Sequence, residues 1–247
     1  MALFGLVLGS GILLVLLTGH WRRQLHAADS GKLTTWDRAA FPAWQRVATL
    51  NAPRPACWLA IKSRDPFAVQ AVLTLTNPKL CFWSEELATQ QQLFIAPPVN
   101  GWVLVIGDGL PCPNTDVDVC FRFLLALSRK LGRVQFFQAD RVLHNHAWAW
   151  LESGRVSRAY AWAGLTLWNQ GVKTPMEKAL GLKCFDYDEY VSTVAWRVDD
   201  LLAANVEKVR LLAARWSLDP AAMDARFWEQ GQGIAGRLGR GLTTTSS

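Results

Sequence analysis

The first apolar run of the sequence covers Ala2 to Gly19, which carry no ionisable side chain and are dominated by Leu, Val, Ile and Phe. An α-helix of this length rises about 27 Å, which is close to the hydrocarbon thickness of a bilayer. The next few positions include Trp21, Arg22 and Arg23, residue types that suit the headgroup region of a membrane. The pattern therefore predicts one transmembrane helix over residues 2–19, with these three side chains in contact with headgroups.

A cleaved signal peptide is the alternative interpretation of this segment. Signal peptides carry basic residues before the apolar run and small residues just before the cleavage site. Here no Lys or Arg precedes Ala2, and at the nearest candidate site, after Ala27, bulky Leu25 stands where a small residue is needed. These flanks favour a retained anchor. Because Arg22 and Arg23 follow the apolar run, we expect the N-terminus outside and the rest of the chain on the cytoplasmic side.

Within the predicted anchor, Gly5 and Gly9 stand four positions apart. Small residues at this spacing let two membrane helices approach closely. Glycine is also common in membrane helices that meet only lipid, so this alternative stays open. Gly5 and Gly9 are therefore candidate contact residues of the anchor, either for a second copy or for another membrane helix.

The pattern after the apolar segment mixes strand-like and helix-like stretches. Short apolar runs bounded by Gly, Pro, Asn or Asp predict strands, and apolar positions three or four apart predict helices. Along the chain, the predicted strands and helices neither alternate one by one nor fall into separate blocks. We therefore expect an α+β domain with a mixed or antiparallel sheet, built with hairpins and packed by several helices. The predicted strands are 57–61, 93–95, 102–106, 134–137, 147–151 and 156–163, and the predicted helices are 35–47, 66–75, 115–131, 175–181, 199–216 and a short one from 220.

Capping residues mark three of the predicted helix starts. Asp65 followed by Pro66 supplies an N-cap and a first-turn proline. Asn114 or Thr115 is expected to cap the helix at 115–131, which has acidic residues in its first turn. Thr174-Pro-Met-Glu177 fits a capping box, in which each end of the motif satisfies a backbone N–H of the other.

Composition sets the limits of the globular part. Residues 20–34 precede the first helical pattern and are expected to form a juxtamembrane linker. All the predicted strands and helices fall within 35–230. From Gly231 onward five of the 17 residues are Gly and the chain ends in Thr and Ser, a composition typical of flexible segments. We therefore expect one α+β domain over 35–230 and a flexible tail over 231–247.

The predicted hairpin around Ser153-Gly154 separates large side chains from small ones. With a two-residue loop, Trp148 faces Ala159, so that a large residue covers a small one. With a three-residue loop and a bulge at the glycine, Trp148 pairs with Tyr160 and the aromatic residues share one face; Ser at the first turn position favours this second register slightly. Such a face is either a core covered by a helix, the more frequent place for large aromatics, or an apolar docking surface. The candidate surface residues are Trp148, Trp150, Tyr160 and Trp162.

Composition and charge narrow the class of protein and of partner. Apolar residues make up 51% of the chain and charged residues 19%, which excludes disorder as its general state. The five cysteines are odd in number and lack any Cys-x-x-Cys spacing, which favours buried thiols in a reducing compartment, although Cys112 and Cys120 could approach one another. The net charge of +6 suits anionic headgroups, so with a predicted anchor we expect a lipid bilayer, and no nucleic acid, as partner.

Asp140, His144 and His146 are the clearest candidates for chemistry. On one strand their side chains would point the same way and supply two imidazoles and a carboxylate to a divalent metal. A loop over 141–145, with hydrogen-bonded histidines at a polar edge, is the alternative. The turn at 107–109 lacks the third glycine of a nucleotide-binding turn. No cofactor and no small-molecule substrate is therefore predicted.

The predicted function follows from the anchor and from the 13 Trp, a residue type frequent at interfaces. We expect a single-pass accessory or interaction subunit of the cytoplasmic membrane that binds one or more protein partners within a larger membrane complex. A membrane-tethered metal-dependent hydrolase or transferase that uses Asp140, His144 and His146 is one alternative. An immunity-type module that binds a toxin is another.

Overall fold

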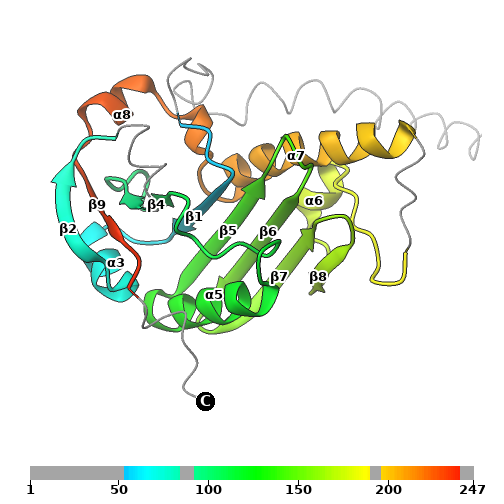
Figure 1. Ribbon diagram of the computed structural model, residues 1–247, viewed down its shortest axis with the longest axis horizontal. Coiled ribbons are helices and arrows are strands. Elements are labelled where there is room, and N and C mark those ends of the chain that lie inside the picture. The colour runs from blue at the N-terminus through cyan, green and yellow to red at the C-terminus, as the bar shows by residue number, and fades with distance from the viewer. Residues whose placement is uncertain (1–52, 84–91, 190–195, 240–247) are drawn as a thin grey trace, which may run out of the picture. The chain divides into compact units, whose positions relative to one another are not determined.

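The computed structural model describes residues 53–83, 92–189 and 196–239 (Figure 1). Over these residues the chain is an α+β domain with an antiparallel sheet and several helices, which confirms this part of the predicted fold class. The predicted anchor, linker and first helix, which together cover residues 2–47, lie outside the described residues. Within the described part, no helix combines the length and the apolar character needed to cross a bilayer.

One sheet of nine strands organises the domain. The strands are β1 (Cys57–Ile61), β2 (Thr76–Cys81), β3 (Leu93–Ile95), β4 (Val103–Ile106), β5 (Arg133–Ala139), β6 (His146–Glu152), β7 (Arg155–Trp162), β8 (Thr166–Gln170) and β9 (Gly233–Arg237). Their order is β2-β9-β3-β4-β1-β5-β6-β7-β8, and every neighbouring pair is antiparallel. The strands from β5 to β8 form a meander of hairpins, whereas β9 inserts late in the chain between β2 and β3.

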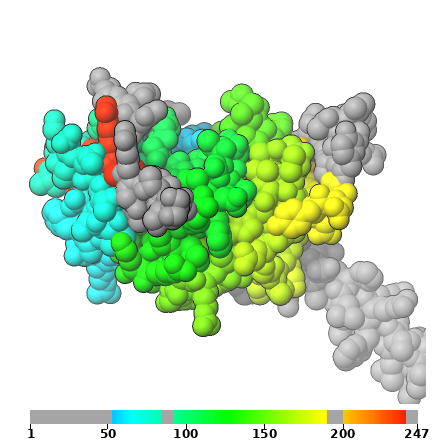
Figure 2. Space-filling view, turned by 60° about the horizontal axis from the view of Figure 1, so that its bottom comes forward, coloured from blue at the N-terminus to red at the C-terminus, as the bar shows by residue number. Residues whose placement is uncertain are grey.

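Helices cover both faces of this sheet. On one face pack α5 (Val117–Leu131) and α3 (Pro66–Leu73), which lie side by side in the space-filling view (Figure 2), α5 in green and the α3 region in cyan. On this face Phe123 of α5 and Phe136 of β5 share one buried cluster. Successive strand residues point to opposite faces, so Phe137 lies on the other face, where it contacts Trp216 of α7 (Trp196–Trp216). The remaining helices are α6 (Pro175–Ala179), the 3₁₀ helix η2 (Pro220–Ala222) and α8 (Ala225–Gln230).

At the centre of the β6–β7 pair, small side chains face α5 and large aromatic side chains lie on the α7 face. Ala149 and Ala159 lie opposite each other and belong to the cluster under α5. Trp148 and Tyr160 also lie opposite each other, on the α7 face, and both are fully buried. Burial of a large apolar side chain contributes about 1.5–3 kcal/mol, so this face is a major source of stability.

The β6–β7 hairpin combines features of both predicted registers. Ser153 and Gly154 have positive φ of 49° and 78°, which is the conformation of a two-residue type I′ turn. The extra residue is accommodated within β7 instead: Leu151 pairs with Val156 but Trp150 pairs with Arg158, which leaves a bulge between these pairs. The aromatic residues therefore share one face, as in the second predicted register, although the turn is the two-residue turn of the first.

The helix caps agree with the prediction except at α5. There the cap is Asp116, whose Oδ1 accepts a hydrogen bond from Val119 N at 2.9 Å. Asn114 instead accepts a hydrogen bond from Gln138 Nε2 of β5, so its side chain is not available to the helix. The prediction that Asn114 or Thr115 caps this helix is therefore wrong by one or two positions. The other two starts are as predicted, with Asp65 at α3 and the capping box of Thr174 and Glu177 at α6.

The flexible tail predicted from Gly231 is wrong over the first part of its length, because β9 lies there. Ile234 and Ala235 are buried, and β9 pairs with both β2 and β3. Glycine allows β9 to pack closely here, because a Cβ at Gly233 would overlap the ring of Phe94. The glycine at position 233, which the composition assigns to a flexible segment, therefore reflects close packing of β9 against Phe94.

Two cysteines are paired, contrary to the expectation of five thiols. Cys57 at the start of β1 forms a disulfide with Cys112 in the loop that precedes α5. Cys120, the other candidate partner of Cys112, is a buried free thiol. The bond ties the entry of α5 to the central strand, which no local spacing in the sequence indicates.

Candidate functional site

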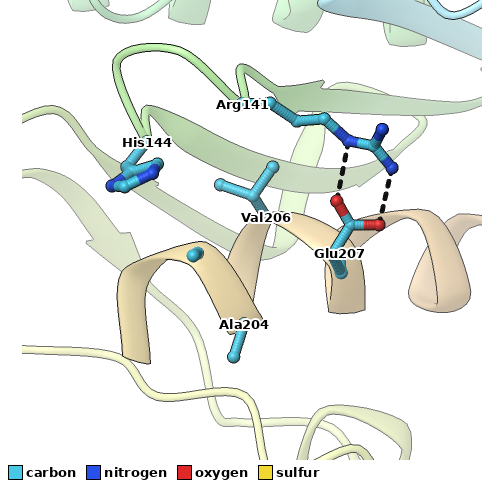
Figure 3. Close-up of a pocket in the computed structure, with 6 residues that line it drawn as sticks. Arg141, His144, Ala204, Val206 and Glu207 are labelled. Carbon is cyan, nitrogen blue, oxygen red and sulfur yellow. Dashed lines mark hydrogen bonds and ion pairs between the residues drawn. The ribbon is translucent and has the colours of Figure 1, made fainter. Parts of the chain in front are cut away.

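A groove lies between the loop that joins β5 to β6 and the exposed side of α7 (Figure 3). Its volume is about 470 Å³. The floor is apolar and comes from the helix, whereas the loop contributes polar side chains at the rim. The lining residues of this feature, the α7 groove, are Arg141, His144, Ala203, Ala204, Val206 and Glu207.

Asp140 fixes the conformation of the β5–β6 loop. Its Oδ1 accepts hydrogen bonds from the backbone N–H of Val142 at 2.9 Å and of Leu143 at 3.1 Å. Its own N–H donates to the carbonyl of Asn145 at 2.9 Å. A carboxylate that caps its own turn in this way pre-organises the backbone. The loop thus holds Val142 and Leu143 outward, 88% and 64% exposed.

An ion pair joins this loop to the helix across one end of the groove. Arg141 Nε lies 2.7 Å from Glu207 Oε1, and Arg141 Nη2 donates to Glu207 Oε2 at 2.8 Å (Figure 3). Both side chains are half exposed, so the pair contributes little to stability, typically less than about 1 kcal/mol. Its two-point geometry nevertheless orients the guanidinium and delimits the groove.

His146 lies in the interior, on the α7 face of the sheet. Its Nδ1–H donates to the carbonyl of His144 at 2.9 Å, and its Nε2 accepts from Asn205 Nδ2 at 3.2 Å. The ring stacks against Trp148 and Trp162. Burial lowers the pKa of His146 to about 4, so the imidazole is neutral at physiological pH.

The three predicted metal-ligand candidates are not brought together as a metal site. β5 ends at Ala139 and β6 begins at His146, so Asp140 and His144 lie in the loop and not on the assumed strand. Asp140 caps its turn, and both ring nitrogens of His146 are engaged in hydrogen bonds. Across residues 53–83, 92–189 and 196–239, no three His, Cys, Asp or Glu side chains are grouped to hold a metal ion.

The aromatic candidates for an interaction surface lie on the α7 face. Trp148, Tyr160 and Trp162 are buried, and Trp150 is half-buried in an edge-on contact with Trp216 of α7. This is the arrangement of a core covered by a helix, one of the two interpretations of this face. The remaining candidates, Gly5, Gly9, Trp21, Arg22 and Arg23, lie outside the described residues.

Of the residues that line the groove, only His144 is among the candidates predicted from the sequence. Ala203, Ala204 and Glu207 lie more than 50 positions after the loop, and no spacing connects the two segments. One local signal was present: Val142 and Leu143 are two consecutive apolar residues within an otherwise polar stretch that begins with a turn-forming Asp. That pattern is typical of an exposed apolar loop tip.

A comparison of this chain with protein-family models, with curated proteins and with solved structures finds no match in any of the three.

Proposed function

We propose that this chain is a membrane-anchored accessory protein whose α+β domain binds a protein partner at the α7 groove. The observation that carries the proposal is the groove itself, an apolar floor between a regular helix and a loop whose backbone is fixed by Asp140. Binding to a pre-organised surface costs little conformational entropy. The partner is expected to insert an apolar side chain between His144 and Ala204.

The rim of the groove supports a protein partner in particular. Interfaces combine an apolar centre with a polar rim that excludes water and fixes orientation. Here Val206 and the two alanines form the centre, and the rim carries His144 and the ion pair of Arg141 with Glu207. A backbone carbonyl or carboxylate of the partner could accept a hydrogen bond from this rim.

Anchoring is the second part of the proposal. The apolar segment 2–19 is long enough to span a bilayer, and Trp21, Arg22 and Arg23 suit its headgroup region. We propose that Gly5 and Gly9 offer a contact for another membrane helix of the same assembly. The domain would then meet its partner at high local concentration, because both are confined to the same membrane.

Two observations bear on the side of the membrane that the domain occupies. Arg22 and Arg23 after the apolar run favour the cytoplasm, whereas a disulfide between Cys57 and Cys112 is typical of oxidising compartments. We propose the cytoplasmic side, because flanking charges act during insertion and the described residues also contain three free cysteines. The redox state of the Cys57–Cys112 pair in cells then tests this placement directly.

Site-specific photo-crosslinking in native membranes tests the partner site. A photoreactive amino acid at Ala204, in the full chain, is expected to give a discrete protein adduct. The same probe at Ser157, exposed on β7 near the opposite end of the sheet, serves as the matched control. The adduct should disappear when Ala203→Arg fills the groove, and a pattern that is identical at positions 204 and 157 would contradict the proposal.

The two alternative functions give different results. An adduct with a soluble protein that persists without detergent or membrane assigns the groove to an immunity-type binding module. Zn²⁺ or Mn²⁺ bound at a stoichiometric level in the purified chain, and lost in His146→Ala, favours the metal-dependent enzyme.

A further inference from the structure

Three exposed apolar side chains lie on two loops at one end of the sheet. Val142 and Leu143 belong to the β5–β6 loop, and Leu165, which is 60% exposed, belongs to the β7–β8 loop. His146 at the start of β6 pairs with Trp162 at the end of β7, so both loops leave the sheet at the same end. We call Val142, Leu143 and Leu165 the loop-tip patch.

The chain enters the described domain at this same end. Ala56 accepts a hydrogen bond from Ala139 N at 2.8 Å, directly before the β5–β6 loop. Pro55 accepts a second one from Arg210 Nη2 at 3.1 Å, which holds the entering segment against α7. The first described residues of the domain therefore lie beside the β5–β6 loop, which carries two of the three patch residues.

Three backbone N–H groups in these two loops are already hydrogen-bonded within the loops. The N–H groups of Val142 and Leu143 are bonded to Asp140, and Ala163 N donates to the carbonyl of Leu165 at 3.0 Å. A polar backbone group that leaves water without a partner costs several kcal/mol in a bilayer. Because these three N–H groups find partners inside the loops, their transfer out of water costs less than that of free N–H groups.

We infer that the loop-tip patch inserts into the headgroup–acyl boundary of the bilayer that holds residues 2–19. This inference rests on the anchor in the proposed function and adds a second contact of the domain with the membrane. In this arrangement the α7 groove, which lies beside the patch, still binds the protein partner. The tips would fix which end of the domain faces the lipid.

The charges around the patch indicate how this contact is driven. Arg141 is neutralised by Glu207, and the Asp140 carboxylate is held by the loop backbone. With no excess of cations on the β5–β6 loop, the contact depends on apolar burial and not on anionic lipids. It is therefore expected to be insensitive to salt and to the fraction of anionic lipid.

Quenching of a fluorescent amino acid by nitroxide lipids tests this inference. The full chain is reconstituted into phosphatidylcholine vesicles, with the fluorophore at Leu143 or, as matched control, at exposed Ser157. Lipids that carry the nitroxide near the top of the acyl chain are expected to reduce the emission at position 143 about twofold, at low and high salt alike, and to leave position 157 unchanged. The same probe at Leu165 should behave as at Leu143.

Every outcome decides between the proposals. If alkaline washing leaves the chain in the vesicles but position 143 is not quenched, the anchor stands and the loop-tip contact is wrong. If the chain leaves the vesicles, both the anchor and the loop-tip contact are overturned. A probe at Leu143 that is shielded only when a protein partner is added assigns the tips to that partner, which also overturns the inference.

A charged variant keeps the test independent of the probe. Val142→Asp combined with Leu143→Asp should fold with unchanged thermal unfolding, because both side chains are exposed. With these charges at the tips, a fluorophore at Leu165 should lose its quenching. Persistent quenching at Leu165 in this variant contradicts the inference.

Discussion

Arg158 and Glu177 form an ion pair inside the α7 face of the sheet: Arg158 Nε lies 2.8 Å from Glu177 Oε1, and the side chains are 2% and 0% exposed. The same oxygen accepts a hydrogen bond from Trp148 Nε1 at 2.8 Å. The other oxygen accepts from Thr174 N at 2.7 Å, which closes the capping box of α6. This pair therefore joins β7, β6 and α6 in one buried network next to the aromatic core.

Replacing one residue of this buried pair should destabilise the domain far more than replacing one residue of an exposed ion pair. Glu177→Ala leaves a buried guanidinium without its carboxylate, and we expect the free energy of unfolding to fall by about 3–5 kcal/mol. The surface pair of Arg133 and Glu152, with side chains 38% and 45% exposed, gives the control: Glu152→Ala should cost less than about 1 kcal/mol. Urea unfolding of the two variants measures the difference. An equal decrease in the free energy of unfolding in both variants would show that the buried network does not stabilise the domain more than the surface pair does.

The buried His146 should make stability depend on pH. Burial lowers its pKa in the folded state to about 4, whereas the unfolded value is near 6.5. The unfolded chain therefore binds a proton that the folded chain does not, so stability is full above pH about 6.5 and falls as the pH is lowered toward about 4. The loss over this window is about 3 kcal/mol.

His146→Gln should remove this dependence, and His144→Gln should keep it. Asp219, whose pKa is raised chiefly by burial, acts in the opposite sense, since stability from that group falls as the pH rises. The comparison of His146→Gln with the unaltered chain cancels the Asp219 contribution, because Asp219 is present in both. Denaturant titrations across the pH range give the slopes, and parallel slopes for the two proteins would contradict the assignment.

Substitution by alanine should lower stability by different amounts at two glycines that have almost the same φ. Gly164 and Gly171 have φ of 78° and 80°, so an alanine at either position is strained by about 1 kcal/mol. A Cβ at Gly164 meets nothing within 4 Å, but one at Gly171 would overlap the carbonyl oxygen of Ser157 in the β7 bulge. Gly171→Ala should therefore lower the midpoint of thermal unfolding clearly more than Gly164→Ala does.

Much of the fold could be predicted because most strands are apolar runs with clear ends. The predicted strand 57–61 has the same bounds as β1, and all five of its residues are buried, as expected for a central strand. Three strands, β2, β8 and β9, were not predicted. β2 reads Thr-Asn-Pro-Lys-Leu-Cys and is largely exposed at one sheet edge, β8 lies at the other edge and ends in Asn-Gln, and β9 is rich in glycine. Their pairing is set by the neighbouring strands, which local propensity cannot express.

The candidate site was harder to predict because it joins distant segments. The residue types around Asp140 suggest a metal ligand, yet an Asp two and three positions before Val142 and Leu143 equally predicts a capped turn, which is what forms. The floor of the groove comes from α7, and only the tertiary fold places Ala204 beside His144. Residue type and spacing thus indicated the right loop but not its role.

The Cys57–Cys112 disulfide should stabilise the purified, oxidised domain. It closes a loop of 55 residues, for which the loss of chain entropy in the unfolded state corresponds to about 4 kcal/mol. We expect a reducing agent to lower the free energy of unfolding by that order in the unaltered chain. The paired replacement Cys57→Ser with Cys112→Ser should show no response, because the remaining cysteines form no disulfide within the described residues.

The redox state of Cys57 and Cys112 in living cells shows on which side of the membrane the domain lies. In the proposed cytoplasmic position, glutathione and thioredoxin keep thiols reduced, so acid trapping followed by alkylation should label both Cys57 and Cys112. Cys120, a buried free thiol in the folded domain, becomes accessible when the acid denatures the chain, so it is labelled in either case and serves as the internal reference. Recovery of Cys57 and Cys112 as an unlabelled, bonded pair would instead place the domain outside the cytoplasm, with the anchor inserted in the opposite direction. The loop-tip contact would survive such a reversal, because it requires the anchor but not a particular leaflet.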